Sequence, residues 1–223
     1  MDSIAIDGPG GVGKSTIAKK LALYLDWFYL NSGLLYRAFA FECLKMGLNI
    51  CDEQAVLNHI DDINIELCPK KDKKINLKYF QIFINGKNCT KKLHNQKVDK
   101  AVAYISKIKQ VREKLTVLQK NVASKENLVM EGRDIGTAIL KDSKNKFYLD
   151  ASPEERARRR FLERSKKDKN VTQSQILQDL KKRDEMDKNR RVSPLKISKD
   201  AICVDTTNLT INEVVAEIIK KLK

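Results

Sequence analysis

The stretch GPGGVGKST at residues 8–16 has residue types and a spacing that point to phosphate chemistry. Glycines allow successive backbone N–H groups to converge on one anion, and a following helix presents its positive end to the same point. Lys14 adds a full positive charge, and the Ser15 hydroxyl is suited to ligate Mg²⁺. The sequence therefore predicts a loop that binds the phosphates of a nucleoside triphosphate.

The surrounding sequence supports this interpretation. Gly8, Gly13, Lys14 and Ser15 fit the phosphate-loop spacing GxxxxGK[ST]. An apolar strand is predicted at 3–6 before the loop, and an amphipathic helix at 14–25 after it, which is the context that the motif requires. We expect the triphosphate contacts to come from the whole loop: Gly8, Pro9, Gly10, Gly11, Val12, Gly13, Lys14, Ser15 and Thr16.

Two clusters of arginine, at 156–164 and 183–191, narrow the class of enzyme. The loop alone is shared by GTPases, motor ATPases and kinases of small molecules. A GTPase needs an NKxD motif, and NKFY at 145–148 lacks the aspartate. Bringing two polyanions together requires several cations, and the planar guanidinium matches phosphate. The clusters therefore favour a kinase that acts on a small anionic acceptor.

The loop and the arginines must be positioned by alternating strands and helices. Apolar and aromatic runs predict strands at 3–6, 27–30, 127–132, 145–151 and 201–205. Helical spacing predicts helices at 14–25, from 33 to the glycine at 47, at 53–60, 98–123, 152–165, 172–191 and 211–222. Ser152 with Glu155, and Thr210 with Glu213, are typical of capping boxes. This alternation predicts an α/β fold whose parallel sheet is covered by helices on both faces.

Residues 61–95 interrupt the alternation. INIELC and INLKYFQIFING indicate short strands joined by a lysine-rich turn, and Asn85-Gly86 indicates a tight turn. We interpret this segment as a small β-rich insert in the α/β domain.

Composition limits the remaining classes of protein. A chain of 223 residues with 42% hydrophobic residues is long enough for one core with an insertion. No apolar run is long enough to span a membrane, and the first residues do not resemble a secretion signal. The five cysteines are scattered and indicate free thiols. We therefore expect a cytoplasmic location. The net charge of +15 is spread along the chain and indicates a solvated lysine surface more than a nucleic-acid site.

Six stretches occur in order along the chain: IDGPGGVGKST, YLNSGLLYRAFA, VREKL, EGRDIGT, FYLDASPEERARRR and KKRDEMDKNRRVSPL. Together they resemble the bacterial-type cytidylate kinase family over nearly the whole sequence. The resemblance implies a P-loop kinase fold with a five-stranded parallel core sheet, a β-rich insert near the acceptor site and an arginine-rich lid. It implies transfer of a phosphoryl group from ATP, with Mg²⁺, to CMP or dCMP in pyrimidine metabolism.

The same resemblance assigns roles to individual residues. Ser32 and Arg37 would meet the CMP phosphate, while Arg112 and Asp134 would face the cytosine edge. Further acceptor contacts would come from Ser106, Arg133, Arg183, Asp187 and Arg190, of which the last three also share one helix face by their spacing. The expected catalytic residues are Lys14, Arg133, Arg160 and Arg190. Arg156 would contact ATP, Ser15 would ligate the metal, and Arg158 would point to solvent.

The predicted organisation is one kinase domain, 1–223. Its core would comprise 1–60, 96–152 and 192–223, its monophosphate-binding insert about 61–95, and its lid about 153–191, with a mobile loop at 165–172. The expected partners are the small molecules CMP and dCMP, with no specific nucleic acid, no membrane and a monomeric state.

Four positions depart from the family pattern. Ala103 replaces a serine, His94 an arginine, Asn31 an aspartate, and Glu131 an aspartate. Two alternatives stay open at this point. The chain could be another small-molecule kinase, such as a uridylate or adenylate kinase, although no DGFPR-like stretch occurs, or a nucleic-acid-binding protein regulated by ATP.

Overall fold

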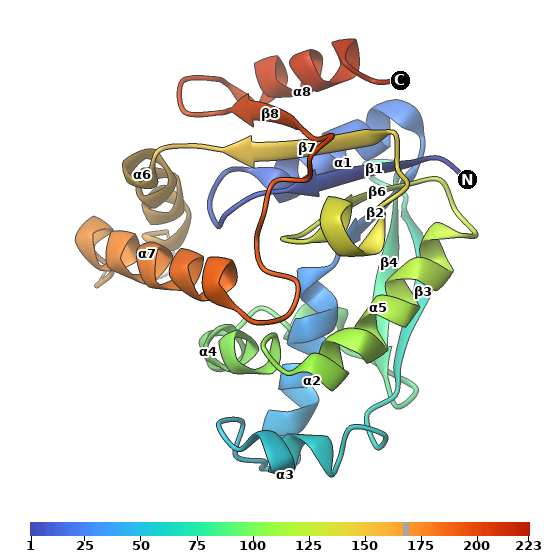
Figure 1. Ribbon diagram of the computed structural model, residues 1–223, viewed down its shortest axis with the longest axis vertical. Coiled ribbons are helices and arrows are strands. Elements are labelled where there is room, and N and C mark those ends of the chain that lie inside the picture. The colour runs from blue at the N-terminus through green and yellow to red at the C-terminus, as the bar shows by residue number, and fades with distance from the viewer. Residues whose placement is uncertain (167–169) are drawn as a thin grey trace. The chain divides into compact units, whose positions relative to one another are not determined.

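The computed structural model describes residues 1–166 and 170–223 (Figure 1). The chain divides into two compact units, each built from segments far apart in the sequence. The first unit comprises residues 1–2 and 22–130, and the second comprises 3–21 and 131–223.

The first unit contains a sheet whose strands follow the order β3-β4-β2-β6. These strands are β2 (Phe28–Asn31), β3 (Ile65–Asp72), β4 (Leu77–Ile84) and β6 (Leu128–Glu131), of which Glu131 belongs to the second unit. β4 runs parallel to β2 and antiparallel to β3, and the short β5 (Lys87–Asn88) pairs with the end of β4.

The insert predicted at 61–95 does consist of strands, but β4 was not expected to join the core. Because β4 pairs with β2, the β-rich segment extends the sheet of its unit. Pro69 lies in β3, which is the edge strand of the sheet. Proline has no N–H to donate to a neighbouring strand, and an edge strand tolerates this because only one of its sides is paired. The predicted tight turn is confirmed, since Asn85 and Gly86 have φ angles of 48° and 74°.

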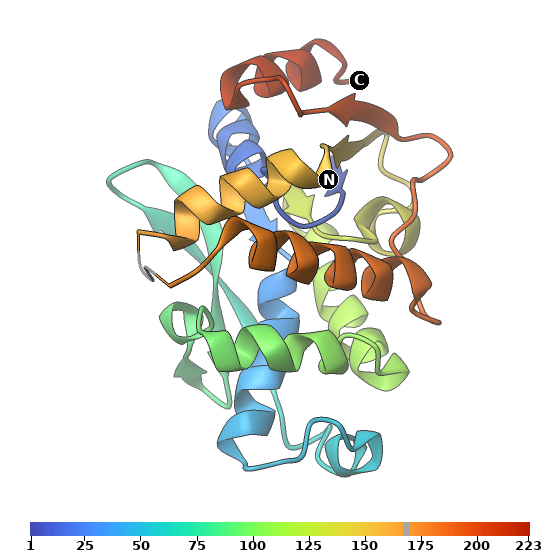
Figure 2. The same ribbon diagram turned by 90° about the vertical axis from the view of Figure 1, so that its left-hand side faces the viewer.

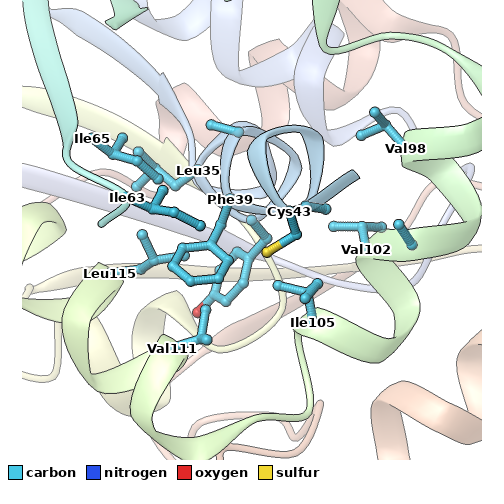
Figure 3. Packing of buried hydrophobic residues seen from close by; sticks show 14 of the residues in the cluster. Leu35, Phe39, Cys43, Ile63, Ile65, Val98, Val102, Ile105, Val111 and Leu115 are labelled. Carbon is cyan, nitrogen blue, oxygen red and sulfur yellow. The ribbon is translucent and has the colours of Figure 1, made fainter. Parts of the chain in front are cut away.

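The helices of the first unit pack around one apolar cluster (Figure 3). They are α2 (Gly33–Lys45), α3 (Glu53–Leu57), α4 (Gln96–Ile105) and α5 (Lys109–Ala123), with a 3₁₀ turn, η1, at Thr90–Lys92. Phe39 of α2 is fully buried and lies among side chains of α4, α5 and the 63–65 segment: Ile63, Ile65, Val102, Ile105, Val111 and Leu115. Burying such side chains stabilises the unit by roughly 1.5–3 kcal/mol each.

The prediction of one helix over 98–123 was wrong at its centre. The chain leaves the helix after Ile105, and Ile108 has extended angles of φ −70° and ψ 119° before α5 begins. Ile105 and Ile108 are both buried. Helical spacing of apolar residues on both sides of the break hid it, because the break itself lacks glycine and proline.

The second unit contains three parallel strands in the order β1-β7-β8. They are β1 (Ser3–Asp7), β7 (Asn145–Asp150) and β8 (Ile202–Asp205). Its helices are α1 (Lys14–Leu25, which continues into the first unit), the π-helix η2 (Ile135–Ile139), α6 (Pro153–Arg164), α7 (Gln173–Asn189) and α8 (Ile211–Lys220). α6 and α7 lie side by side (Figure 2).

Two helix starts follow the predicted caps. The Thr210 side chain accepts from the Glu213 amide and the Glu213 carboxylate accepts from the Thr210 amide, so this capping box is complete. Ser152 caps α6 by accepting from the Glu155 amide at 3.2 Å. The Glu155 carboxylate instead binds Arg158 and Arg159, so only half of that box forms.

All five strands predicted for the parallel core are present: β1, β2, β6, β7 and β8. The fold is therefore α/β with a mostly parallel sheet and flanking helices, as the sequence predicts. The five cysteines carry no disulfide. Within the described part of the chain, no helix is both long and apolar enough to cross a membrane.

Candidate active site

The loop between β1 and α1 has a backbone that its glycines make possible. Gly8, Gly11 and Gly13 have φ angles of 144°, 84° and 91°, which side chains on L residues disfavour. A Cβ at Gly8 would also lie 2.1 Å from the Leu149 carbonyl oxygen of β7. The loop ends where α1 begins, with the Thr16 amide donating to the Gly13 carbonyl at 3.0 Å. The predicted phosphate loop is thus a strand–loop–helix unit with an N-terminal helix end at its mouth.

Lys14 is the buried cation of this loop. Its Nζ donates to the carbonyls of Gly8 at 2.8 Å and Pro9 at 2.6 Å. Burial, with a further contribution from Arg133, lowers the pKa of Lys14 to about 7, although Glu131 and Asp7 act in the opposite direction. A phosphate at the loop would favour the protonated form, so the ammonium charge responds to what the loop binds.

Ser15 and Glu131 form the oxygen donor set of the loop. The Ser15 hydroxyl donates to Glu131 Oε1 at 2.5 Å, and Glu131 is buried at the end of β6. Mg²⁺ prefers hard oxygen ligands and is commonly held by one or two protein oxygens together with phosphates and water. A hydroxyl beside a carboxylate fits that ion.

Asp7, at the end of β1, ties the loop to η2. Its two carboxylate oxygens accept from the amides of Ile135 at 2.8 Å and Gly136 at 2.7 Å. Burial raises the pKa of Asp7 to about 6, although the two amides act in the opposite direction. The segment that follows Asp134 is therefore anchored directly beneath the loop.

A network of arginines surrounds one aspartate of α7. The Asp187 carboxylate lies 3.0 Å from Arg133 Nε, 3.4 Å from Arg183 Nε and 3.9 Å from Arg190 Nη1. Burial alone would raise the pKa of Asp187, but the three guanidinium groups hold it below its usual range. Three cations thus share this one carboxylate. Arg183 and Asp187 share one face of α7 as predicted. Arg190 lies outside the helix, at its C-cap with extended angles of φ −64° and ψ 141°, and approaches Asp187 from there.

The network reaches the phosphate loop through Arg133 and extends to Asp134 through Arg190. A Cβ at Gly10 would lie 3.7 Å from Arg133 Nη2, so this guanidinium is next to the loop. Arg190 Nη2 lies 3.2 Å from Asp134 Oδ1, and both side chains are buried. Asp134 is thus brought together with Arg190 of its own unit.

Arg156 joins the loop to both helices of the predicted lid. Its Nη1 donates to Asp184 Oδ2 of α7 at 2.6 Å and to the Gly10 carbonyl at 3.1 Å, and its Nε donates to the Ala151 carbonyl. Arg156 is 5% exposed, so it is a buried part of the loop's surroundings. Asp184 Oδ1 is buried without a hydrogen-bond partner among the described residues.

The other arginines of α6 are more peripheral. Arg158 is 55% exposed and pairs with Glu155, so the expectation that it points to solvent is confirmed. Arg159 donates to the carbonyl and hydroxyl of Thr206. Arg160, predicted to be catalytic, is half-buried and pairs with Glu163 at 2.8 Å on the same helix. The predicted loop at 165–172 includes 167–169, which lie outside the described residues.

In the first unit, Arg112 and Ser106 come together across the break between α4 and α5. Arg112 Nη1 donates to the Ser106 carbonyl at 3.1 Å, and its guanidinium lies 5.1 Å from the ring centroid of Tyr36. Both Ser106 and Arg112 are buried. The helix break therefore forms the turn that holds these two predicted base contacts.

The two predicted phosphate contacts of the first unit lie at the start of α2. Ser32 is buried at the N-cap position. Arg37, one turn further on, forms an ion pair with Asp99 of α4 and donates to the Leu93 carbonyl at 3.2 Å. Asp99 fixes the direction of the Arg37 side chain.

A family model described as cytidylate kinase matches residues 4–223. This chain belongs to the cytidylate kinase family. A cytidylate kinase of Caldanaerobacter subterraneus subsp. tengcongensis is 40% identical over 220 residues, covering 99% of this chain and 94% of that protein. A cytidylate kinase of Clostridium botulinum strain Langeland is 41% identical over 221 residues, covering 99% and 97%. The family membership thus extends over the phosphate loop, the arginine network and both units.

The fold also resembles a solved structure at low identity. An uncharacterized protein from Eubacterium ventriosum has a TM-score of 0.53 and 19% identity, covering 100% of this chain and 98% of that chain. At this identity the likeness concerns the fold alone.

The structure adds residues to which the sequence assigned no role. Glu131 accepts from Ser15 of the loop, and Asp184 accepts from Arg156, which also donates to the Gly10 carbonyl. Asp7 directly precedes the loop and accepts from the Gly136 amide. Asp7 and Glu131 both stand at the carboxyl end of an apolar strand, and this position was the signal that could have identified them. Asp184 carried no such signal, because it is one of many charged residues on α7.

Proposed function

We propose that this protein transfers the γ-phosphoryl group of ATP to CMP or dCMP, giving ADP and CDP or dCDP, in pyrimidine nucleotide metabolism. Membership of the cytidylate kinase family supports this assignment. The observation that carries it is the phosphate loop with Arg133 at its side, and with Arg133, Arg183 and Arg190 gathered around the buried Asp187. This arrangement concentrates positive charge where two anionic substrates must meet.

The loop residues bind the donor in this proposal. Backbone amides of residues 8–16 and the end of α1 bind the β- and γ-phosphates, and Lys14 exchanges its carbonyl partners for phosphate oxygens. Ser15 and Glu131 would hold Mg²⁺. When bound, the ion neutralises charge on the β- and γ-phosphates.

The arginines act on the group that is transferred. A CMP phosphate oxygen forms a bond to the γ-phosphorus while the bond from that phosphorus to the β–γ bridging oxygen breaks. Charge accumulates on the oxygens of the transferring group and on the bridge, where Lys14, Arg133 and Arg190 stabilise it. No covalent enzyme intermediate is needed, and positioning the two substrates in line supplies much of the rate. Arg160 is proposed to take part after it leaves Glu163.

The acceptor contacts keep the roles that the family resemblance implies. In this proposal the CMP phosphate is bound by Ser32 and Arg37, and its ribose by Arg183 and Asp187. The cytosine base is contacted by Arg112 and Ser106. Asp134 is proposed to accept from the cytosine N4 amino group. Its ion pair with Arg190 means that the same carboxylate also orients a catalytic arginine.

The proposal also includes the predicted division of the chain into a core, an insert and a lid. One kinase domain comprises a core, an acceptor-side insert at about 61–95 and a lid at about 153–191. The buried contact between Arg156 and the Gly10 carbonyl supports a lid whose helices are tied to the phosphate loop. A monomeric state and a cytoplasmic location stay predictions.

The direct test follows the labelled phosphoryl group. Purified protein, Mg²⁺ and ATP labelled at the γ-phosphate are incubated with CMP, and the nucleotides are separated by chromatography. The proposal predicts label in CDP in an amount equal to the ADP formed. Release of labelled inorganic phosphate without labelled CDP would identify an ATPase and refute the proposal.

A further inference from the structure

A cavity of about 540 Å³ lies in the second unit, outside the residues assigned to the two substrates. One wall is η2, which contributes Gly136, Thr137 and Ala138. The other wall is the segment 193–199 that follows α7, and Lys146 of β7 also lines the space. None of these residues belongs to the phosphate loop or to the arginine network.

The charge of this cavity is strongly positive. Four lysines line it, Lys141, Lys146, Lys196 and Lys199, and no acidic residue does. Lys146 is 5% exposed and its Nζ lies 2.7 Å from Asp200 Oδ2 just outside the lining.

The Asp200 carboxylate therefore neutralises one of the four lysine ammonium groups, and the lining keeps a net charge of +3. The hydrogen bonds from Lys146 and Ser198 lower the pKa of Asp200 to about 2, so this balance holds at neutral pH. The other three lysines have no ion pair among residues 1–166 and 170–223.

The remaining lining groups suit a ligand with both a polar and an apolar part. The Thr137 hydroxyl oxygen is buried and has no hydrogen-bond partner within the described chain, a state that normally costs free energy until a partner is found. Pro194 and Ile197 provide an apolar surface, and Ile197 is 52% exposed. The lining thus combines apolar and cationic groups, as sites for small polar ligands do.

We propose that this cavity binds a phosphorylated small molecule of nucleotide size or less. Its phosphate contacts the lysine cluster Lys141, Lys196 and Lys199, which act as point charges. Its body lies against Pro194 and Ile197.

Both walls of the cavity are joined to residues of the proposed transfer site. The Ser193 carbonyl accepts from Arg190 Nε at 2.6 Å, and Ser193 has a φ of 46°, in the left-handed region. On the other wall, the Gly136 amide donates to Asp7 at 2.7 Å, directly before the phosphate loop. A ligand that moves either wall therefore moves Arg190 or Asp7. This regulatory consequence rests on the proposed function, whereas binding itself does not.

Backbone amide shifts measured by NMR test the binding. The protein is first saturated with Mg²⁺, CMP and a non-hydrolysable ATP analogue, so that the substrate sites are occupied. Ribose 5-phosphate and inorganic phosphate are then titrated, with ribose as the arm that lacks phosphate. We expect saturable shifts at Thr137, Ala138 and Lys199 with ribose 5-phosphate, weaker binding of inorganic phosphate, and no shifts with ribose.

Charge reversal distinguishes the cavity from general attraction to a basic protein. Lys196→Glu with Lys199→Glu should weaken ribose 5-phosphate binding at least tenfold and leave basal turnover within twofold. The matched control, Lys20→Glu with Lys144→Glu, changes the net charge equally at exposed residues outside the lining and should bind normally. Absence of shifts at 10 mM ligand, or equal weakening in both pairs, would overturn the proposed site.

Turnover measured with and without ribose 5-phosphate tests the coupling separately. The wild type should change at least twofold and the Lys196→Glu, Lys199→Glu variant should not. Binding with unchanged turnover would refute the regulatory link, while loss of CMP phosphorylation in every sample would refute the proposed function instead.

Discussion

Lys14 illustrates how a single residue acquires its chemistry from burial. Two carbonyls and a nearby arginine surround an ammonium group whose pKa falls to about 7. The sequence predicted its contact with phosphate, because the motif requires a lysine there. It could not predict the low pKa, which depends on Arg133 and on the packing of the loop.

The lowered pKa makes nucleotide binding depend on pH. At pH 8 Lys14 is mostly neutral in the free protein, and bound phosphates raise its pKa, so binding of a non-hydrolysable ATP analogue should take up close to one proton. At pH 6 the lysine is already protonated, and the uptake should be near zero. Calorimetry in buffers of different ionisation enthalpy measures this difference.

Lys14→Met is the matched variant for this measurement. It should remove the extra proton uptake at pH 8 and lower turnover by about 10²-fold or more, while thermal unfolding shows a folded protein. Equal proton uptake in the variant and the wild type would show that another group titrates.

Asp134 has two proposed partners, cytosine N4 and Arg190, and one substitution separates them. If the carboxylate accepts from the cytosine N4 amino group, Asp134→Ala should lower CMP phosphorylation far more than UMP phosphorylation. Uracil has an oxygen at the position of N4, so UMP binding to the wild type already carries an unfavourable contact of about 1–3 kcal/mol. If Asp134 only orients Arg190, both rates should fall by the same factor. The ratio of kcat/KM for CMP to that for UMP is the measurement, and an unchanged ratio would contradict the base-reading role.

At the scale of elements, α6 and α7 pack side by side, and the buried ion pair of Arg156 with Asp184 joins them. Asp184→Asn keeps the shape of the side chain but leaves the Arg156 guanidinium without its counter-ion. We expect the free energy of unfolding to fall by about 2–3 kcal/mol, and turnover to fall as well, because Arg156 also holds the Gly10 carbonyl. Urea unfolding and steady-state kinetics measure the two effects.

Asp179→Asn provides the control on the same helix, since Asp179 is exposed. It should change the unfolding free energy by less than about 0.5 kcal/mol. If Asp184→Asn were equally mild, the pair would not hold the helices in the way that we describe.

Elements were predictable where a local pattern determines them. α1 begins and ends at the predicted residues, since strand, loop and amphipathic spacing all agree there. The break at Ser106–Ile108 was not predictable, because it is stabilised by Arg112 donating back to the Ser106 carbonyl and not by a helix-breaking residue. The pairing of β4 with β2 was also missed, since strand partners are chosen by tertiary packing.

For the whole molecule, the net charge of +15 raises the alternative of a nucleic-acid partner. Under the kinase assignment, retention of RNA or DNA should be weak, independent of sequence and lost as salt is raised from 50 to 200 mM. Filter binding over that range measures this property. Tight, salt-resistant retention of one sequence would favour the nucleic-acid-binding alternative.

The central claim concerns the acceptor, and a coupled assay of ADP release with a panel of nucleoside monophosphates tests it most directly. The account predicts that CMP and dCMP support turnover, that UMP is clearly poorer, and that AMP and GMP support little or none. Turnover on UMP or AMP that equals or exceeds turnover on CMP would contradict the account.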